Sequence, residues 1–184
     1  MKKNTKIISF LFIFLISTFF FFKEKYIIGL FFILLSFIPI FFIFRNEFLI
    51  LSLFKIIRKD FNGLEKYLKC IKDPESQLTK EQISYYYFLN GILYSNKNLL
   101  KSEYYMKKSL DLGLRLNENI AIAKLNIAIA HLSRGDKKNA KNFLLEAKKM
   151  DASGMLREHI QFIYIKMKKM NENCMMNPFI KRSL

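Results

Sequence analysis

The sequence predicts an all-α protein, made of an apolar N-terminal helical hairpin and a domain of stacked amphipathic helices. Two charge-free apolar runs, residues 7–22 and 26–44, predict the hairpin. Apolar and small residues over 126–151 follow helical spacing, and similar chemistry recurs every 38 residues. With 184 residues, the chain is long enough for one helical domain beside the hairpin.

The two N-terminal runs are each close to the ~20 apolar residues that an α-helix needs to cross a bilayer. Neither contains Asp, Glu, Lys or Arg, and Lys23-Glu24-Lys25 separates them. The first run has the basic start of a signal peptide, but no small-residue cleavage pattern follows it. We therefore expect residues 1–45 to form a membrane hairpin of two transmembrane helices.

The positions of basic residues predict the orientation of this hairpin. The basic residues that flank the two runs are Lys2, Lys3, Lys6, Arg45, Lys55, Arg58 and Lys59. The turn between the runs holds only Lys23 and Lys25. If both runs cross, the positive-inside rule predicts a multi-pass protein of the cell membrane, with its N-terminus and helical domain facing the cytoplasm.

Residues 48–54 continue the apolar pattern beyond the second run. They either prolong the second membrane helix or begin the first helix of the following domain. The second alternative is favoured, because Arg45 and Glu47 would otherwise lie inside a longer span. The segment is then expected to pack against the helix that follows it.

Residues 126–151 have a regular helical pattern with one interruption. The apolar or small residues at helical spacing are Ile127, Ala128 and Ala130 before the interruption and Ala140, Phe143, Leu144 and Ala147 after it. The interruption contains Gly135 and Asp136. Glycine tolerates the left-handed conformation that ends many helices, and aspartate caps the start of the next. The pattern predicts two helices joined by a tight turn.

This helix pair resembles a tetratricopeptide repeat. In that family small residues stand where the two helices of a unit cross closely, as Ala128, Ala140 and Ala147 do here. Gly135-Asp136 matches the turn between the helices, and Leu144 matches a bulky position on the second helix. The resemblance implies a short α-solenoid, in which neighbouring helix pairs stack to bury a continuous core.

The same chemistry recurs at a constant offset of 38 residues, against about 34 in the usual tetratricopeptide unit. The matching sets are Leu64, Ser102 and Ala140; Leu68, Met106 and Leu144; and Leu51, Leu89 and Ile127. The repeat domain is predicted over residues 46–170, with residues 152–170 as a closing helix. Residues 171–184 are predicted to form a flexible basic tail.

The resemblance also implies a binding surface. In the family, the first helix of each unit lines a concave groove that holds a peptide segment. The implied groove residues are Tyr87, Phe88, Gly91 and Tyr94 in the second unit and Leu125, Asn126, Ile129 and Leu132 in the third. This aromatic and apolar groove suits a helix or an extended apolar segment of a partner protein. Each tyrosine could equally be a packing residue of an ordinary helical core.

The sequence offers no basis for enzyme activity. His131 and His159 are its only histidines, and neither has a companion at metal-ligand spacing. Cys70 and Cys174 form no C-x-x-C pair, and the chain lacks a phosphate-binding glycine motif. We expect no catalytic residue, no metal and no cofactor.

The formal net charge of +16 favours acidic partners, such as anionic lipids, nucleic acid or an acidic protein surface. Nucleic acid is the least expected of these, because the lysines are dispersed and no nucleic-acid-binding motif is present. The leading hypothesis is a membrane-anchored scaffold or adaptor that binds a protein or peptide in the groove and contacts lipids through its hairpin and basic surface. The alternative is a small basic membrane protein that acts within the membrane, such as an immunity or toxin-type factor or a transporter accessory subunit.

Overall fold

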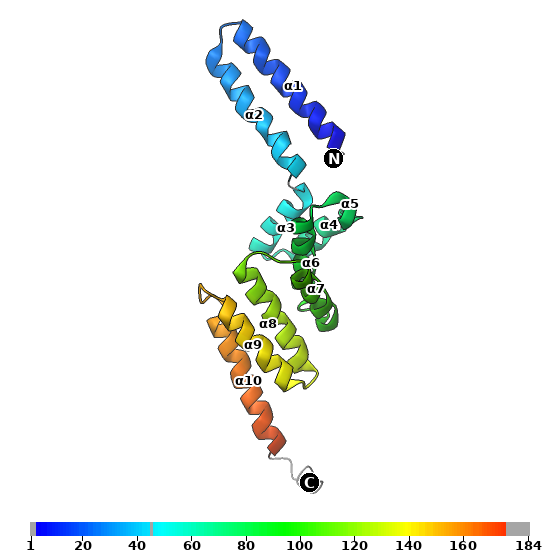
Figure 1. The fold of residues 1–184 in the computed structure, drawn as a ribbon, viewed down its shortest axis with the longest axis vertical. Coiled ribbons are helices and arrows are strands. Elements are labelled where there is room, and N and C mark those ends of the chain that lie inside the picture. The colour runs from blue at the N-terminus through cyan, green and yellow to red at the C-terminus, as the bar shows by residue number, and fades with distance from the viewer. Residues whose placement is uncertain (1–2, 45, 176–184) are drawn as a thin grey trace. The chain divides into compact units, whose positions relative to one another are not determined.

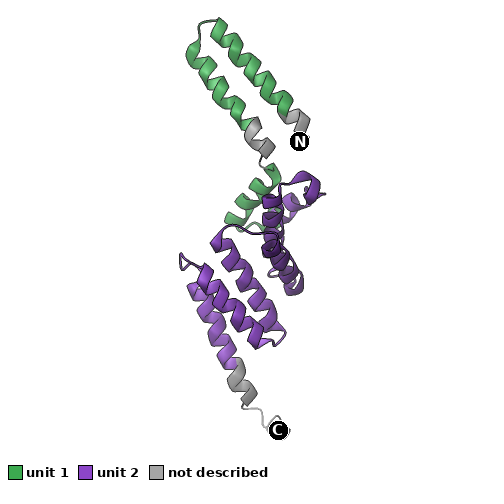
Figure 2. Cartoon of the chain, in the orientation of Figure 1, with its two compact units in different colours: residues 1–63 green, residues 64–184 purple. Residues whose placement is uncertain are grey.

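A computed structural model of the chain describes residues 3–44 and 46–175. These residues form ten α-helices and no strand, which confirms the predicted all-α class (Figure 1). The chain divides into two compact units, unit 1 over residues 1–63 and unit 2 over residues 64–184 (Figure 2). This division lies later in the chain than the border predicted after residue 45.

Unit 1 begins with two helices that pack side by side as an antiparallel hairpin, α1 (Lys3–Phe22) and α2 (Tyr26–Phe44) (Figure 1). The turn lies where Lys23-Glu24-Lys25 interrupts the apolar runs. The Ser17 hydroxyl donates a hydrogen bond to the Gly29 carbonyl oxygen at 2.8 Å. This bond satisfies a buried polar group between the two helices, as an apolar environment requires.

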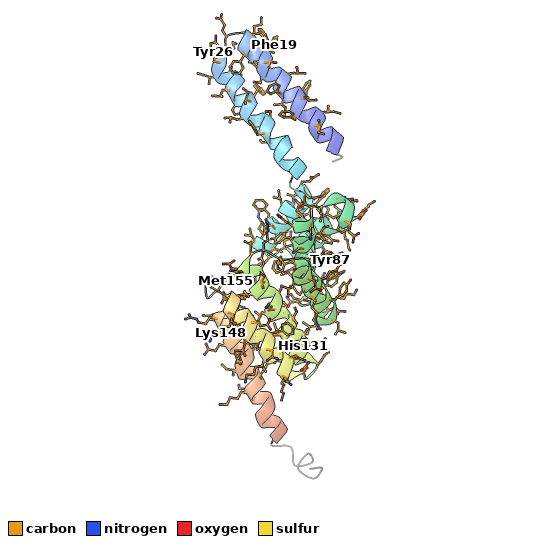
Figure 3. All side chains as sticks on the ribbon, in the orientation of Figure 1. Phe19, Tyr26, Tyr87, His131, Lys148 and Met155 are labelled. Atoms are coloured by element: carbon orange, nitrogen blue, oxygen red, sulfur yellow. The ribbon has the colours of Figure 1, made fainter. Side chains whose placement is uncertain are left out.

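The surface of the hairpin is apolar. Figure 3 shows side chains projecting from both helices, with Phe19 and Tyr26 labelled near the turn. The exposed large apolar residues include Ile8, Leu11, Phe12, Leu15, Phe19, Phe22, Ile27, Leu30, Phe31, Leu34 and Phe37. Burial is described for residues 7–22 of α1 and 26–38 of α2. Within the described residues, no helix is both long enough and apolar enough to cross a membrane.

The helix α3 (Glu47–Ile57) follows the hairpin and is capped by Asn46, whose side chain accepts a hydrogen bond from the Phe48 N–H at 2.9 Å. The prediction that the apolar segment 48–54 packs inward is only partly correct. On α3, Leu49 and Ser52 are buried. The larger side chains that remain exposed on this helix are Leu51, Leu53, Phe54 and Ile57.

A tight turn leads from α3 to α4 (Phe61–Lys69). Asp60 stabilises this turn, because its carboxylate accepts hydrogen bonds from the Lys55 ammonium and from the Gly63 N–H, both at 2.8 Å. These bonds lower the pKa of the Asp60 carboxyl, with the bond from Lys55 as the main cause.

Unit 2 contains two long helix pairs and a final helix. Its remaining helices are α5 (Pro74–Gln77), α6 (Lys80–Tyr94), α7 (Leu99–Asp111), α8 (Asn117–Ser133), α9 (Lys137–Met150) and α10 (Arg157–Met175). The pairs are α6 with α7 and α8 with α9, and α7 also packs against α8. Leucine, isoleucine, alanine and methionine side chains of α8, α9 and α10 share one buried core.

The 38-residue recurrence is visible in the positions of the second helices. Phe61, Leu99 and Lys137 begin α4, α7 and α9, and each is 38 residues after the one before. All six residues of the first two matching sets are buried, and all but the serine are apolar. They are Leu64, Leu68, Ser102, Met106, Ala140 and Leu144. The third set differs, because Leu89 and Ile127 are fully buried whereas Leu51 is exposed. The position on α3 therefore departs from the pattern of α6 and α8.

The two helices of the α6–α7 pair approach each other closely at small residues. The Ser102 hydroxyl on α7 donates a hydrogen bond to the Gly91 carbonyl oxygen on α6 at 2.8 Å. A Cβ atom on Gly91 would lie only 2.7 Å from the Sδ atom of Met106. A larger residue at position 91 would therefore force the Met106 side chain to move. On the α8–α9 pair, Ala128 and Ala140 are fully buried small residues of the shared core.

The turn between α8 and α9 has the conformation that its sequence predicts. Gly135 has a φ of +81°, in the left-handed region that favours glycine. The Asp136 carboxylate accepts a hydrogen bond from the Asn139 N–H at 3.1 Å and so caps α9.

The end of the chain differs from its prediction. The closing helix begins at Arg157 rather than at Ala152, because the segment between α9 and α10 forms a turn in which the Asp151 carboxylate accepts a hydrogen bond from the Leu156 N–H. The helix also continues to Met175, so the predicted flexible tail is wrong for residues 171–175. The rest of the predicted tail, residues 176–184, lies outside the described residues.

Leu144 and Leu145 offer a direct test of the core of unit 2. Leu144 is fully buried between helices, whereas its neighbour Leu145 is exposed. We expect Leu144→Ala to lower the free energy of unfolding by about 3 kcal/mol, because it leaves a cavity. The same change at Leu145 should cost no more than about 0.5 kcal/mol. Urea unfolding of the full chain, followed by circular dichroism, measures both; equal losses would contradict this packing.

Candidate partner-binding groove

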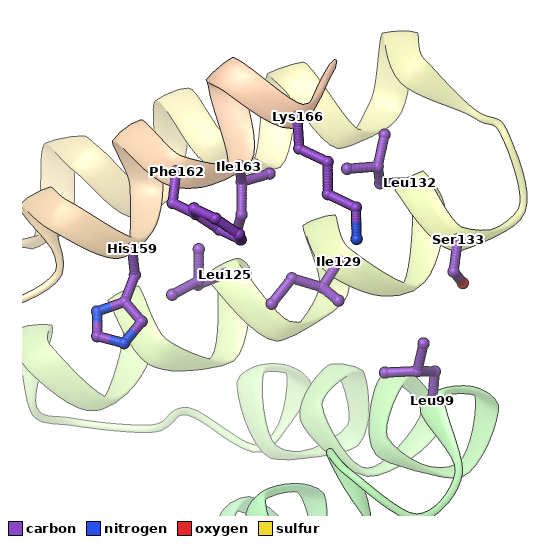
Figure 4. A pocket seen from close by; sticks show the side chains of 9 residues that line it. All are labelled: Leu99, Leu125, Ile129, Leu132, Ser133, His159, Phe162, Ile163 and Lys166. Atoms are coloured by element: carbon purple, nitrogen blue, oxygen red, sulfur yellow. The ribbon is translucent and has the colours of Figure 1, made fainter. Parts of the chain in front are cut away.

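A cavity of about 530 Å³ opens between α8 and α10, beside the start of α7 (Figure 4). We call it the α8–α10 groove. Its lining residues are Leu99, Leu125, Ile129, Leu132, Ser133, His159, Phe162, Ile163 and Lys166. Six of these nine side chains are leucine, isoleucine or phenylalanine, and none is acidic. Pockets of this size and apolar character are typical of binding sites.

Helical periodicity determines which side chains reach the groove. On α8, Leu125, Ile129 and Leu132 lie four and then three residues apart, so they share one face of the helix. On α10, the core-facing residues anchor the helix to α8 and α9, which leaves Phe162 on the groove side with 67% of its surface exposed. Lys166 extends over the groove from the same helix (Figure 4).

The groove contains part of the predicted binding surface. Of the predicted residues in the third unit, Leu125, Ile129 and Leu132 line it. Asn126 does not, and its side-chain amide instead donates a hydrogen bond to the Ile122 carbonyl oxygen within α8 at 2.9 Å.

The predicted residues of the second unit lie elsewhere. Phe88 has only 2% of its surface exposed and Gly91 is buried, so both are packing residues of the α6–α7 pair. Tyr87 and Tyr94 are half-buried, and each stacks on Tyr105 of α7, with ring centroids 6.1 and 5.6 Å from that of Tyr105. Lys108 and Lys101 lie over the rings of Tyr87 and Tyr94 respectively.

Sequence reasoning missed the α10 wall of the groove. The missed residues on this helix are His159, Phe162, Ile163 and Lys166. A signal for them was present, because Ile163 is 38 residues after Leu125 and both line the groove. Continuing the recurrence beyond the third unit would therefore have identified α10 as a lining helix.

An ion-pair network around the buried Glu103 links α7 to the end of α8. Glu103 on α7 has 7% of its surface exposed. Its carboxylate accepts hydrogen bonds from both terminal nitrogens of Arg134 and from the Lys107 ammonium, the last at 2.7 Å. These bonds, that from Arg134 first, lower the pKa of Glu103 to about 2. The network therefore fixes the position of Leu99, at the start of α7, relative to the α8 side of the groove.

His131 completes the network on the α8 side. Its Nδ1 atom lies 2.9 Å from the Asp136 carboxylate and its Nε2 atom 3.3 Å from the Glu103 carboxylate. The second contact is close enough for an ion pair but lacks hydrogen-bond alignment. The imidazole ring also stacks on Phe143 of α9, with centroids 5.4 Å apart. These contacts assign His131 a packing role between helices.

Among the described residues, no group of three or more His, Cys, Asp or Glu side chains is arranged to hold a metal ion. Comparisons with protein-family models, with curated proteins and with solved structures give no match.

The Glu103 network predicts a pH dependence of stability. The pKa of this carboxyl is about 2 in the folded protein against an ordinary 4.5, so the unfolded chain takes up its proton more readily. The stabilisation is complete above about pH 4.5 and is lost as the pH falls towards about 2. We expect Glu103→Gln to lower the free energy of unfolding near neutral pH by about 2 kcal/mol and to remove this part of the acid dependence. Urea unfolding at several pH values measures both effects.

Glu65 provides the matched control. Hydrogen bonds from Lys69 and Lys97 lower the pKa of its carboxyl to about 2 as well, but the Glu65 side chain is 28% exposed against 9% for Glu103. Solvent screens such pairs, so Glu65→Gln should cost clearly less stability than Glu103→Gln. Equal losses would show that burial of the Glu103 network contributes nothing.

Proposed function

We propose that this chain is a membrane-anchored protein-interaction module, with unit 2 as a tetratricopeptide-like α-solenoid whose α8–α10 groove binds a segment of a partner protein. The observation that supports a partner site is the groove itself, with an apolar lining and a phenylalanine ring that is two-thirds exposed. An aromatic side chain left in water next to an apolar cavity stabilises a complex when a partner covers it.

The shape of the groove favours a helix or an extended segment as the occupant. It lies between two helices, each of which contributes side chains spaced three and four residues apart. Grooves of this kind receive a partner through a few apolar anchors at corresponding spacing. The 38-residue recurrence of α4, α7 and α9 supports the α-solenoid class, because stacked helix pairs of one length produce such a recurrence.

The apolar surface of the α1–α2 hairpin supports the membrane anchor. Exposure of apolar surface to water costs about 25 cal/mol per Å², so many exposed phenylalanines and leucines would destabilise the hairpin in water. In a lipid environment this cost disappears, and the hydroxyl of Ser17 is already hydrogen-bonded within the hairpin. In this proposal the hairpin inserts into the cell membrane and unit 2 faces the cytoplasm.

Photo-crosslinking in cells tests the groove. A photo-reactive phenylalanine analogue at Phe162 should give a discrete adduct with a partner protein, and one at Lys138, exposed on α9, should give none. Within the adduct, the crosslinked partner peptide can be identified by mass spectrometry. Adducts of equal yield from both positions would contradict a groove-specific partner.

Two variants of α10 form a matched pair for the same assay, with the photo-reactive analogue placed at Ile129. Phe162→Asp puts a charge into the groove and should reduce the adduct roughly tenfold. Ile165→Asp makes the same kind of change at an exposed apolar residue of α10 outside the groove lining, and should leave the adduct unchanged.

The alternative function, in which the hairpin itself acts within the membrane, is tested by replacing residues 1–45 with an unrelated membrane anchor. If the hairpin is the active part, this replacement should abolish the function of the protein in cells.

The orientation of the hairpin is tested by labelling in intact cells. Lys23→Cys places a thiol in the turn of the hairpin, and the native Cys70 is exposed in unit 2. A membrane-impermeant maleimide should label the turn in intact cells but Cys70 only after lysis, because the positive-inside rule places unit 2 in the cytoplasm. The Cys174→Ser substitution removes the other native thiol, so the maleimide reports only on position 23 and Cys70. Labelling of Cys70 in intact cells would overturn this topology.

A further inference from the structure

The outward side of α3 is apolar along the length of the helix. Leu51, Leu53, Phe54 and Ile57 are exposed, with Phe54 at 56% and Ile57 at 69%. The opposite side contains the buried Leu49 and Ser52. A short helix in an aqueous surface normally has the reverse pattern, with polar residues outward. The exposed face of α3 therefore needs an apolar surrounding.

Basic residues lie at the end of this apolar face. Arg58 and Lys59 follow the helix directly, both are exposed, and neither has an acidic partner in the described part of the chain. Lys55 differs, because the Asp60 carboxylate binds its ammonium at 2.8 Å. The face thus combines exposed apolar side chains with two unpaired cations.

The length and position of α3 indicate where such a face could be buried. The helix has 11 residues, which corresponds to about 16 Å and is roughly half the thickness of the hydrocarbon core. It begins at Glu47, shortly after α2 ends at Phe44. A helix this short cannot cross a bilayer, but one next to a membrane anchor can lie along the membrane surface.

We infer that α3 is an interfacial helix, which buries Leu53, Phe54 and Ile57 at the boundary between headgroups and acyl chains of a bilayer and binds anionic lipid headgroups through Arg58 and Lys59. This inference rests on the proposed membrane anchor, because the hairpin holds α3 at the bilayer. The Asn46 cap supports it, since capped helix ends leave fewer unsatisfied N–H groups in a poorly hydrated layer.

Depth-dependent fluorescence quenching tests the inference on the full chain in vesicles. A fluorophore is attached at Ile57→Cys in a Cys70→Ser, Cys174→Ser background, and the vesicles contain phosphatidylserine and lipids brominated near the headgroup. We expect the emission at position 57 to fall at least about threefold, as for a residue at the acyl boundary. The same fluorophore at Lys138→Cys on α9 is the solvent control and should be unaffected.

A second variant examines the lipid preference. Arg58→Glu with Lys59→Glu should reduce quenching at position 57 in vesicles with phosphatidylserine and have little effect in neutral vesicles, because only the electrostatic attraction is reversed. Quenching that is equal in both vesicle types for the parent protein, and unchanged by the variant, would overturn the role assigned to the two cations.

A third fluorophore position separates this inference from the anchor proposal. Leu30→Cys reports on the hairpin itself, where Leu30 is exposed. Quenching at position 30 without quenching at position 57 overturns the interfacial role of α3 and leaves the anchor standing. Absence of quenching at both positions overturns both. If position 57 is unquenched but a crosslinker there joins two copies of the chain, a dimer rather than a bilayer covers this face, which also overturns the inference.

Discussion

The close approach of neighbouring helices at small side chains is the constraint on which unit 2 depends. Where Ser102 meets Gly91, a Cβ atom on the glycine would displace the Met106 side chain, and on the α8–α9 pair the small residues Ala128 and Ala140 are fully buried. This closeness brings the larger side chains of each pair, such as Met106 and Leu144, into complete burial. Ser102 and Met106 on α7 recur 38 residues later as Ala140 and Leu144 on α9, so the second helices of the two pairs bury equivalent positions.

The buried charge of Glu103 also shapes this framework. Glu103 is buried and would destabilise the fold if its charge were unpaired, but Arg134 and Lys107 neutralise it through hydrogen bonds. The residues come from α7 and from the end of α8, so the network specifies how one helix pair meets the next. Apolar contacts alone would leave that orientation less well defined, because they have no preferred direction.

The features that sequence could predict are those that local chemistry determines. The charges between the apolar runs predict that α1 ends at Phe22 and that α2 begins at Tyr26. Gly135 and Asp136 predict the turn between α8 and α9. The exposed face of α3 could not be predicted, because an apolar segment has the same sequence whether its side chains pack inward or remain outside. The groove was only partly predicted: the recurrence from Leu125 to Ile163 points to α10, but the other residues of this wall depend on how the helix packs.

The packing of α10 has a thermodynamic consequence for the groove. Among the described helices its core contacts are with α8 and α9, and a helix held from one side opens more readily than a helix packed between two neighbours. One side of the groove therefore belongs to a helix that opens readily. A ligand that binds the closed form must supply part of its binding free energy to hold α10 in place, and in return it slows amide exchange along the whole helix. The affinity of the groove for a ligand and the rate of amide exchange in α10 thus both depend on the equilibrium between the open and closed positions of this helix.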